Sequence, residues 1–292
     1  MKRILITILT TFAFVAGGCS TQELQPQIVA TTLPVYEFTA YLCQNTELRV
    51  ERLITENVSC LHDYTLKTKQ MRAAESAQLL ILSGAGLDDF VDGVTNYTPT
   101  TVNCANGIHL ICSENESAHQ HNGEHHHDKD PHIWLSPTNA KIMVENIYNG
   151  LISIYPEHRE IFQANRVELN AKLDELEQYG KTQLQSLSSR ELITFHDGFS
   201  YLAQAFDLTV LHAIEEESGS EASAGELIKI IQLIEDHNMK AIFTESSSSV
   251  SAAQIISAEA RTAVFELDMC MGKRGYFDAM YHNIDTLKEA LE

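Results

Sequence analysis

Histidine is the residue type in this sequence that is best suited to chemistry. The chain has 13 histidines, and six of them fall between positions 119 and 132, in the run His-Gln-His-Asn-Gly-Glu-His-His-His-Asp-Lys-Asp-Pro-His. Imidazole is a common protein ligand for zinc and similar metal ions. Such a tract is typical of a metal-collecting segment, although a solvated polar loop could carry the same residues by accident.

The histidines of this tract are interchangeable in that interpretation. The cluster offers more imidazoles than one metal ion needs, so the loss of any single one should have little effect. They are His119, His121, His125, His126 and His127, in a loop that we place at residues 118–129.

Three further histidines lie next to segments that are predicted to be ordered. His132 begins the apolar run Ile133-Trp134-Leu135, His62 follows a predicted strand, and His196 closes another. One histidine in such a place is more often a structural residue than a ligand. Three of them at the ends of strands, beside a histidine-rich loop, favour a metal site.

The overall charge makes cations the favoured partners. The 292 residues include 20 Lys and Arg against 40 Asp and Glu, which gives a formal net charge of −20, and 44% of the residues are hydrophobic. This composition is typical of a globular protein, and the length allows one large domain or two ordinary ones. Because nucleic-acid binding depends mainly on Lys and Arg contacts to phosphates, we expect no nucleic-acid partner.

The first residues have the pattern of an export signal. Lys2 and Arg3 precede an uncharged run at 4–16, which Gly17-Gly18-Cys19 follows. This pattern predicts a signal peptide over residues 1–18, because the apolar run is shorter than the about 20 residues that span a bilayer. The small residues before Cys19 are similar to the bacterial lipobox, so we expect Cys19 to be acylated and residues 19–26 to tether the folded part outside the membrane. Simple secretion and an incidental cysteine are the alternatives.

Two similar halves follow this leader. In the first half, β-type runs at 27–33, 48–54 and 78–84 alternate with helical stretches at 35–44 and 67–77. In the second half, strands at 192–195, 209–211, 241–244 and 263–267 alternate with helices near 201, at 226–235 and at 252–261, and Ser223 is a predicted N-cap. The alternation predicts an α/β fold with two lobes, each a mostly parallel sheet covered by helices.

A long amphipathic segment separates the two halves. Apolar residues recur at helical spacing from Pro156 to Leu187, which predicts one helix over 156–187. It is either a surface helix of one domain or, as its length and central position favour, a rigid strut between lobes at 27–155 and 188–292. Because ligands bind beyond the carboxyl ends of strands in open α/β sheets, two facing lobes predict a site between them.

Several motifs occur in the order found in one protein family. The most specific is Asp130-Pro131-His132-Ile133-Trp134-Leu135-Ser136-Pro137. It is accompanied by His62-Asp63-Tyr64, by Ser-Gly-Ala-Gly-Leu-Asp at 83–88, by Thr-Phe-His-Asp-Gly-Phe-Ser-Tyr-Leu at 194–202, and by Phe243-Thr244-Glu245. From about residue 27 to residue 291, the chain resembles the zinc-type substrate-binding proteins of bacterial ABC importers. The resemblance implies two βα lobes bridged by one rigid helix, with the metal in the cleft between them.

The resemblance also implies a set of metal ligands. It makes His62 and His132 ligands from the first lobe, and it makes His196 and Asp268 ligands from the second. The manganese and iron branches of the family usually have a carboxylate at the position of His196. The histidine there therefore implies Zn²⁺ as the transported ligand.

The fourth ligand has competitors. Water or Glu245 could take the place of Asp268, and so could a thiolate, because Cys60 and Cys270 lie close to the motifs. Members of the family commonly have a proline just before the first ligand histidine, whereas this chain has Cys60-Leu61 there.

The sequence does not determine which cysteines form disulfides. If Cys19 is acylated, an odd number of cysteines remains, so at least one thiol is unpaired. Export permits disulfides, and Cys104 could pair with Cys112, or Cys43 with Cys60. Buried free thiols are the alternative for these residues and for Cys270.

The resemblance implies high-affinity zinc capture outside the cytoplasm and delivery to an ABC permease and its ATPase. We expect a monomer that contacts the membrane through its lipid anchor alone and that is not an enzyme. A manganese- or iron-binding transport protein of the same family and a metal-dependent surface adhesin are the alternatives. A zinc hydrolase would need an open metal position and a general base, and the sequence has no His-Glu-x-x-His motif.

Overall fold

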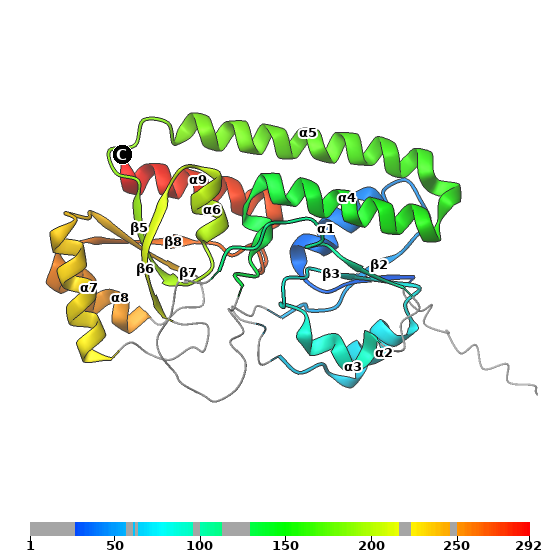
Figure 1. The fold of residues 1–292 in the computed structure, drawn as a ribbon, viewed down its shortest axis with the longest axis horizontal. Coiled ribbons are helices and arrows are strands. Elements are labelled where there is room, and N and C mark those ends of the chain that lie inside the picture. Colours follow the sequence, from blue (N-terminus) through cyan, green and yellow to red (C-terminus); the bar gives the residue numbers. More distant parts are fainter. Residues whose placement is uncertain are drawn as a thin grey trace, which may run out of the picture.

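The computed structural model describes residues 27–56, 61, 64–95, 100–112, 129–215, 223–245 and 250–292. Within these ranges the chain forms two lobes, each built on a four-stranded parallel sheet (Figure 1). The first sheet has the order β2-β1-β3-β4, from β1 (Ile28–Ala30), β2 (Val50–Arg52), β3 (Leu79–Leu82) and β4 (Thr101–Asn103). The second has the order β6-β5-β7-β8, from β5 (Glu191–His196), β6 (Thr209–Glu215), β7 (Ala241–Glu245) and β8 (Ala263–Leu267). The two sheets therefore repeat one topology, and the predicted two-lobed α/β fold is confirmed.

Helices cover both sheets. They are α1 (Leu33–Leu42), α2 (Thr68–Ser76), α3 (Asp92–Thr95), α4 (Pro137–Ile154), α5 (Arg159–Gln183), α6 (Ser200–Ala205), α7 (Ala224–Asp236), α8 (Val250–Ala260) and α9 (Tyr276–Leu291), with short 3₁₀ turns η1 (Asp89–Val91), η2 (Ile133–Leu135) and η3 (Pro156–His158). The alternation of strands and helices is confirmed, but β4, α3, α4 and α9 were not predicted. The N-cap at Ser223 is confirmed as part of a capping box with Glu226.

The long helix α5 joins the lobes. Figure 1 shows it running along the whole molecule, above α4 of the first lobe and α9 of the second. The helix has 25 residues, which corresponds to a length of about 37 Å. It differs from the prediction at both ends, because Pro156 opens a separate 3₁₀ turn and the helix ends at Gln183. A strut between lobes is therefore the correct interpretation.

The main hydrophobic core runs through both lobes. Buried side chains of the first lobe, such as Phe38 and Trp134, belong to the same cluster as Tyr201 and Tyr276 of the second. Tyr276 packs edge-on against Phe38, with ring centroids 4.8 Å apart, and its hydroxyl donates to the backbone oxygen of Trp134 at 2.9 Å. The indole N–H of Trp134 donates in turn to the backbone oxygen of Met269 at 2.9 Å. The lobes are thus packed together by a shared core and by hydrogen bonds across it.

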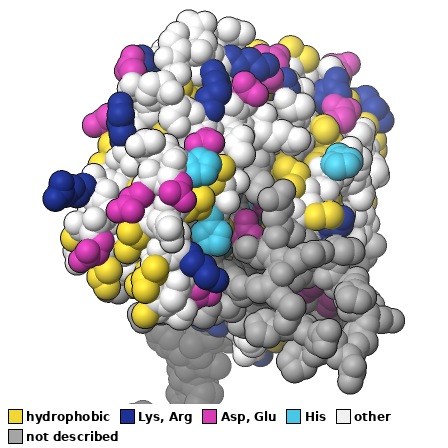
Figure 2. All heavy atoms as spheres, turned by 60° about the vertical axis from the view of Figure 1, so that its left-hand side comes forward, with side chains coloured by type: hydrophobic (Ala, Val, Ile, Leu, Met, Phe, Trp, Pro, Cys, Tyr) yellow, Lys and Arg dark blue, Asp and Glu magenta, His cyan; other side chains and the backbone are white. Residues whose placement is uncertain are grey.

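A second, smaller core lies within the second lobe. It contains Ile193 and Phe195 of β5 and residues of α7 and α8. The outer surface of this layer leaves Ile228, Ile255 and Val264 exposed. Figure 2 shows this end of the molecule, where apolar side chains lie among acidic and basic ones. No helix within the described ranges is both long enough and apolar enough to cross a bilayer.

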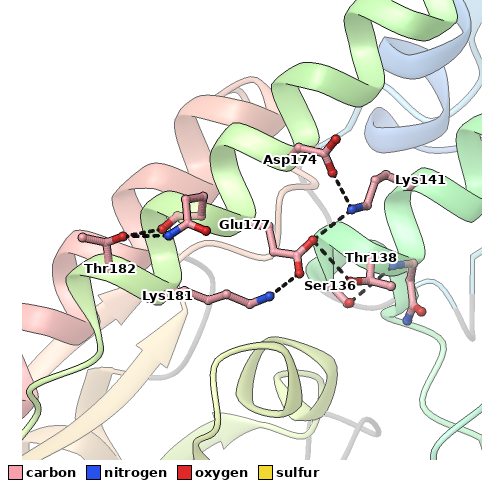
Figure 3. Close-up of polar contacts among 9 residues, drawn as sticks. Ser136, Thr138, Lys141, Asp174, Glu177, Lys181 and Thr182 are labelled. Atoms are coloured by element: carbon pink, nitrogen blue, oxygen red, sulfur yellow. Dashed lines mark hydrogen bonds and ion pairs between the residues drawn. The ribbon is translucent and has the colours of Figure 1, made fainter.

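A polar network fixes α4 on α5 (Figure 3). The Lys141 ammonium donates to Asp174 at 2.7 Å and to Glu177 at 3.0 Å, and Lys181 donates to the other oxygen of Glu177 at 2.6 Å. Thr138 donates to Glu177 as well, at 3.5 Å. The helix α4 begins at Pro137, shortly after His132 and η2. The network therefore fixes the helix that follows His132 on the linking helix α5.

Several sequence predictions lie outside the described residues. They concern the signal peptide at 1–18, Cys19, Cys60, His62 and the tract histidines. Cys43, Cys104, Cys112 and Cys270 are described, and all four are free thiols, so the possible pairing of Cys104 with Cys112 is not formed. Burial raises the pKa of the Cys104 thiol well above its usual value, which is typical of an inert core cysteine.

Candidate metal centre

Two of the predicted ligands meet between the lobes. His132 precedes η2 in the first lobe, and His196 is the last residue of β5 in the second. Their Nε2 atoms are 3.2 Å apart, and their rings lie nearly perpendicular, with an interplanar angle of 83°. Only 4% of His132 and 7% of His196 is exposed. The fold therefore brings together two imidazoles that are 64 positions apart in the sequence.

The separation of the two nitrogens fits a metal site. Two nitrogen ligands at 2.0–2.1 Å from a tetrahedral zinc ion lie about 3.3 Å from each other. The measured 3.2 Å agrees with that value. The same distance also permits a hydrogen bond between the rings, so the support for a metal comes from the distance together with the surroundings of the pair.

Asp130 orients the ring of His132. One carboxylate oxygen, Oδ1, accepts from the backbone N–H of His132 at 2.9 Å and lies 2.8 Å from its Nδ1. With the Nδ1 proton directed to Asp130, the lone pair of Nε2 faces His196, as a metal-ligating histidine requires. The other oxygen, Oδ2, is buried without a hydrogen-bond partner among the described residues. A buried carboxylate beside the pair favours a cation at this position.

Gly198 allows the two rings to come this close. A Cβ atom at this position would lie 2.7 Å from Nδ1 of His132, 2.7 Å from Cδ2 of His196 and 2.8 Å from Cε of Met269. Any side chain here would therefore push the rings or the methionine away. The glycine of the His196-Asp197-Gly198 segment is needed for this close approach, a role that the sequence alone did not reveal.

Asp268 directly follows β8, and its side chain contacts residues of the same loop. Its Oδ1 accepts from the backbone N–H of Cys270 at 2.8 Å, and its Oδ2 pairs with Arg274 at 3.3 Å. Its backbone N–H and C=O both bond the buried side chain of Asn283, each at 2.7 Å. Within the described part of the chain, no group of three His, Cys, Asp or Glu side chains is placed to hold a metal ion.

Glu245 ends the strand next to His196. Thr194 of β5 pairs with Phe243 of β7, so His196 and Glu245 lie at the same level of the carboxyl edge. Glu245 is 8% exposed. Because neighbouring strands lie about 4.8 Å apart, Glu245 stays a candidate for the fourth ligand position, as does Asp268.

Cys270 is poorly suited to bind a metal. It is buried, its backbone is left-handed with φ of 58°, and its thiol donates to the backbone oxygen of Asp268 at 3.8 Å. Burial raises the pKa of this thiol well above its usual value, which disfavours the thiolate that zinc needs.

Sequence comparisons connect the chain to zinc uptake. The family model described as "Zinc-uptake complex component A periplasmic" matches residues 28–290. The high-affinity zinc uptake system protein ZnuA of Bacillus subtilis is 30% identical over 290 residues, which cover 94% of this chain and 90% of that protein. The zinc-binding lipoprotein AdcA of Streptococcus pneumoniae strain R6 is 28% identical over 311 residues, which cover 100% of this chain and 62% of AdcA. The chain thus spans less than two thirds of the length of AdcA.

A solved structure shows the same fold. The metal-dependent lipoprotein YcdH from Bacillus subtilis superposes with a TM-score of 0.76 at 28% sequence identity. The match covers 91% of this chain and 99% of that one, so it includes both lobes and the helix between them.

Proposed function

The chain belongs to the zinc-uptake family of periplasmic component A proteins, which are solute-binding proteins and not enzymes, and from this we propose that it captures Zn²⁺ outside the cytoplasm. The captured ion is passed to an ABC-type permease that is driven by its ATPase. The observation that carries the proposal is the buried pair of imidazoles, His132 and His196, held 3.2 Å apart between the lobes beside the carboxylate of Asp130.

We propose that His62 completes three imidazole ligands and that Asp268 supplies the fourth. His62 follows β2 in the sequence, and in open α/β sheets ligands bind beyond the carboxyl ends of the strands. For Asp268 to bind the ion, its carboxylate must leave Arg274. Three nitrogen ligands favour zinc over manganese, because manganese prefers oxygen ligands. A shell of four protein ligands suits retention of an ion and leaves no open position for hydrolysis.

Anchoring and metal collection belong to the same proposal. Cys19 would carry the lipid, and residues 19–26 would form the tether. The names of AdcA and YcdH as lipoproteins support this assignment. Radiolabelled fatty acid should label the full-length protein in cells and should not label Cys19→Ser. The histidine-rich loop would gather ions near the site without itself being the transport site.

Metal binding to purified protein of residues 20–292 tests the transport site. We expect one tight zinc equivalent that outcompetes manganese, a loss of at least about 1,000-fold in affinity for His196→Ala and for His132→Ala, and no loss for His237→Ala. His237 is the matched control, because it is half-exposed and paired with Glu191 at the opposite edge of the second sheet. Tight zinc binding that survives His196→Ala would contradict the proposal.

A variant that lacks the histidine-rich loop tests whether the loop holds the transport site, and it must keep Cys112 and Lys129. Cys112 and Lys129 form an antiparallel bridge at the two ends of segment 113–128, so a deletion that removed Lys129 would break this bridge. Deletion of 116–127 keeps both residues, and one tight zinc equivalent should remain. Loss of that equivalent would place the main site in the loop.

The fourth ligand is tested by two isosteric substitutions. Asp268→Asn should weaken zinc binding more than Glu245→Gln does, because an amide is a poor substitute for a carboxylate ligand. The opposite order would assign the fourth position to Glu245. Equal and small effects would assign it to water.

A further inference from the structure

Tyr201 connects the second lobe to the first through its hydroxyl group. It lies on α6, on the segment that begins at His196, and 1% of the residue is exposed. The hydroxyl donates to the backbone oxygen of Asp130 at 3.1 Å and accepts from the backbone N–H of Ile111 at 3.0 Å. Burial raises the pKa of Tyr201 to about 12, so the hydroxyl keeps its proton at physiological pH.

The two residues that Tyr201 contacts belong to one small structure of the first lobe. The N–H of Asp130 donates to the backbone oxygen of Ile111 at 3.0 Å, and Cys112 bridges Lys129. We refer to Ile111, Cys112, Lys129 and Asp130 as the neck, because these residues join the two ends of segment 113–128. One hydroxyl of the second lobe thus bonds both strands of the neck.

The neck is linked directly to the metal centre. Asp130, which gives its backbone oxygen to Tyr201, uses its side chain to bond both the backbone N–H and the ring of His132. His196 lies at the start of the segment that carries Tyr201. The two imidazoles are therefore held by residues that Tyr201 bonds together across the lobes.

We propose that Tyr201 is a positioning residue that fixes the neck on the second lobe and thereby holds His132 at zinc-binding distance from His196. This inference rests on the proposed zinc site. The hydroxyl touches no metal, and it acts through Asp130. Its loss should loosen the neck, let His132 turn away from His196 and speed zinc release. The same contact holds Asp130 of the neck, two residues before His132 in the sequence.

Tyr201→Phe removes the hydroxyl and keeps the buried ring. The measurement is the zinc dissociation rate, followed with an excess of a chromogenic chelator, together with affinity by competition. We expect release about tenfold faster than in the wild type, the size typical of losing a group that orients a metal ligand. Tyr155→Phe is the matched control, because its buried hydroxyl donates to Gln78 at 3.0 Å within the first lobe. The control should release zinc at the wild-type rate, and equal rates for both variants would overturn the inference.

A double variant separates positioning from general stability. If Tyr201 acts through the hydrogen bonds of Asp130 to His132, then adding Tyr201→Phe to Asp130→Ala should change the zinc release rate less than twofold. Effects that multiply in the double variant would overturn the inference, because they would show independent action. If Asp130→Ala does not fold, the comparison of Tyr201→Phe with Tyr155→Phe decides alone.

Failure of this inference is distinct from failure of the proposed function. Tight zinc binding in His196→Ala would reject the zinc site itself. Loss of zinc in His196→Ala, with a wild-type release rate in Tyr201→Phe, would keep the zinc site and reject the role of Tyr201.

Discussion

His196 and His132 reach the same point by different means. His196 ends β5, which pairs with β6 on one side and with β7 on the other, so regular sheet hydrogen bonds fix its backbone. His132 follows no strand, and a few side chains hold it, chiefly Asp130. The position of His196 is therefore set by the sheet, whereas that of His132 depends on individual hydrogen bonds. Single substitutions away from the metal should disturb His132 more easily than His196.

The two sheets also differ in the length of their strands. The strands of the first lobe have three or four residues, and those of the second have five to seven. The second lobe still leaves apolar side chains on its outer layer, with 65% of Ile228 and 49% of Ile255 exposed. The longer strands of this lobe support His196 at their carboxyl ends, whereas its outer layer leaves apolar side chains in contact with solvent. The first lobe, with short strands, relies on α4, α5 and the neck.

The strongest test of this comparison acts on both histidines at once. Gly198→Ala should lower zinc affinity about 100-fold or more, because its methyl group would lie 2.7 Å from atoms of both rings. Gly93→Ala is the control, since a Cβ there meets nothing within 4 Å. Isothermal titration with zinc measures the effect. Unchanged affinity in Gly198→Ala would show that the rings separate freely and that their close approach is not required.

Asp130→Asn tests the position of His132 alone. The expected loss of zinc affinity is about 10- to 100-fold, because an amide replaces the charged acceptor that orients His132. Histidine-selective NMR should show changes at the His132 ring and little change at His196. Asp236→Asn, an exposed substitution at the end of α7, is the control. Equal changes at both rings would contradict the idea that the two ligands are fixed separately.

Asp88 tests how polar contacts stabilise the first lobe. It is buried, its Oδ2 accepts from the N–H of Gly84, and burial raises its pKa to about 6. Above pH 6 the buried carboxylate is ionised and destabilises the folded protein, and a folded-state pKa of about 6 against an unfolded value of about 4 corresponds to about 3 kcal/mol. This penalty grows as the pH rises from the unfolded-state pKa of about 4 to the folded value.

Asp88→Asn should therefore increase the free energy of unfolding of the metal-free protein at pH 7.5. We expect about 1 kcal/mol, because the amide keeps an acceptor for Gly84 but does not match every contact. At pH 4.5 the gain should disappear. Urea unfolding at the two pH values measures this difference, with exposed Asp89→Asn as the control. A loss of stability of the same size at both pH values would refute the prediction.

The smallest effect is expected at the linking helix. Glu177→Gln weakens the ion pairs with Lys141 and Lys181, which should cost about 0.5 kcal/mol of stability at low salt and less at high salt. Zinc affinity should stay unchanged, because the shared core and not this network packs the lobes together. Exposed Glu175→Gln on the same helix serves as the control for the change in charge. A large drop in zinc affinity would mean that the network on α5 positions His132.

Much of the fold could be predicted from local patterns. Apolar runs bounded by turns located seven of the eight strands found in the described residues, and periodic apolar residues located α5. The helix α4 also has a helical pattern, with Ala140, Met143, Val144, Ile147 and Leu151 buried, and Ser136 with Pro137 marks its start. These residues are a sufficient signal for a helix in the sequence. The strand β4 was missed because Thr101–Asn103 is short and mostly exposed.

The residue types that can bind a metal ion, and most of the elements that carry them, could be predicted from local sequence patterns. The Asp130-Pro131-His132 motif and His196 at the end of a strand were recognisable without a structure. Three features depend on how the two lobes pack: the two imidazoles lie 3.2 Å apart, Gly198 makes room for them, and Tyr201 bonds the neck. The physical reason is distance along the chain. Periodicity and capping act between near neighbours, whereas the meeting of two histidines 64 positions apart depends on how the two lobes pack together.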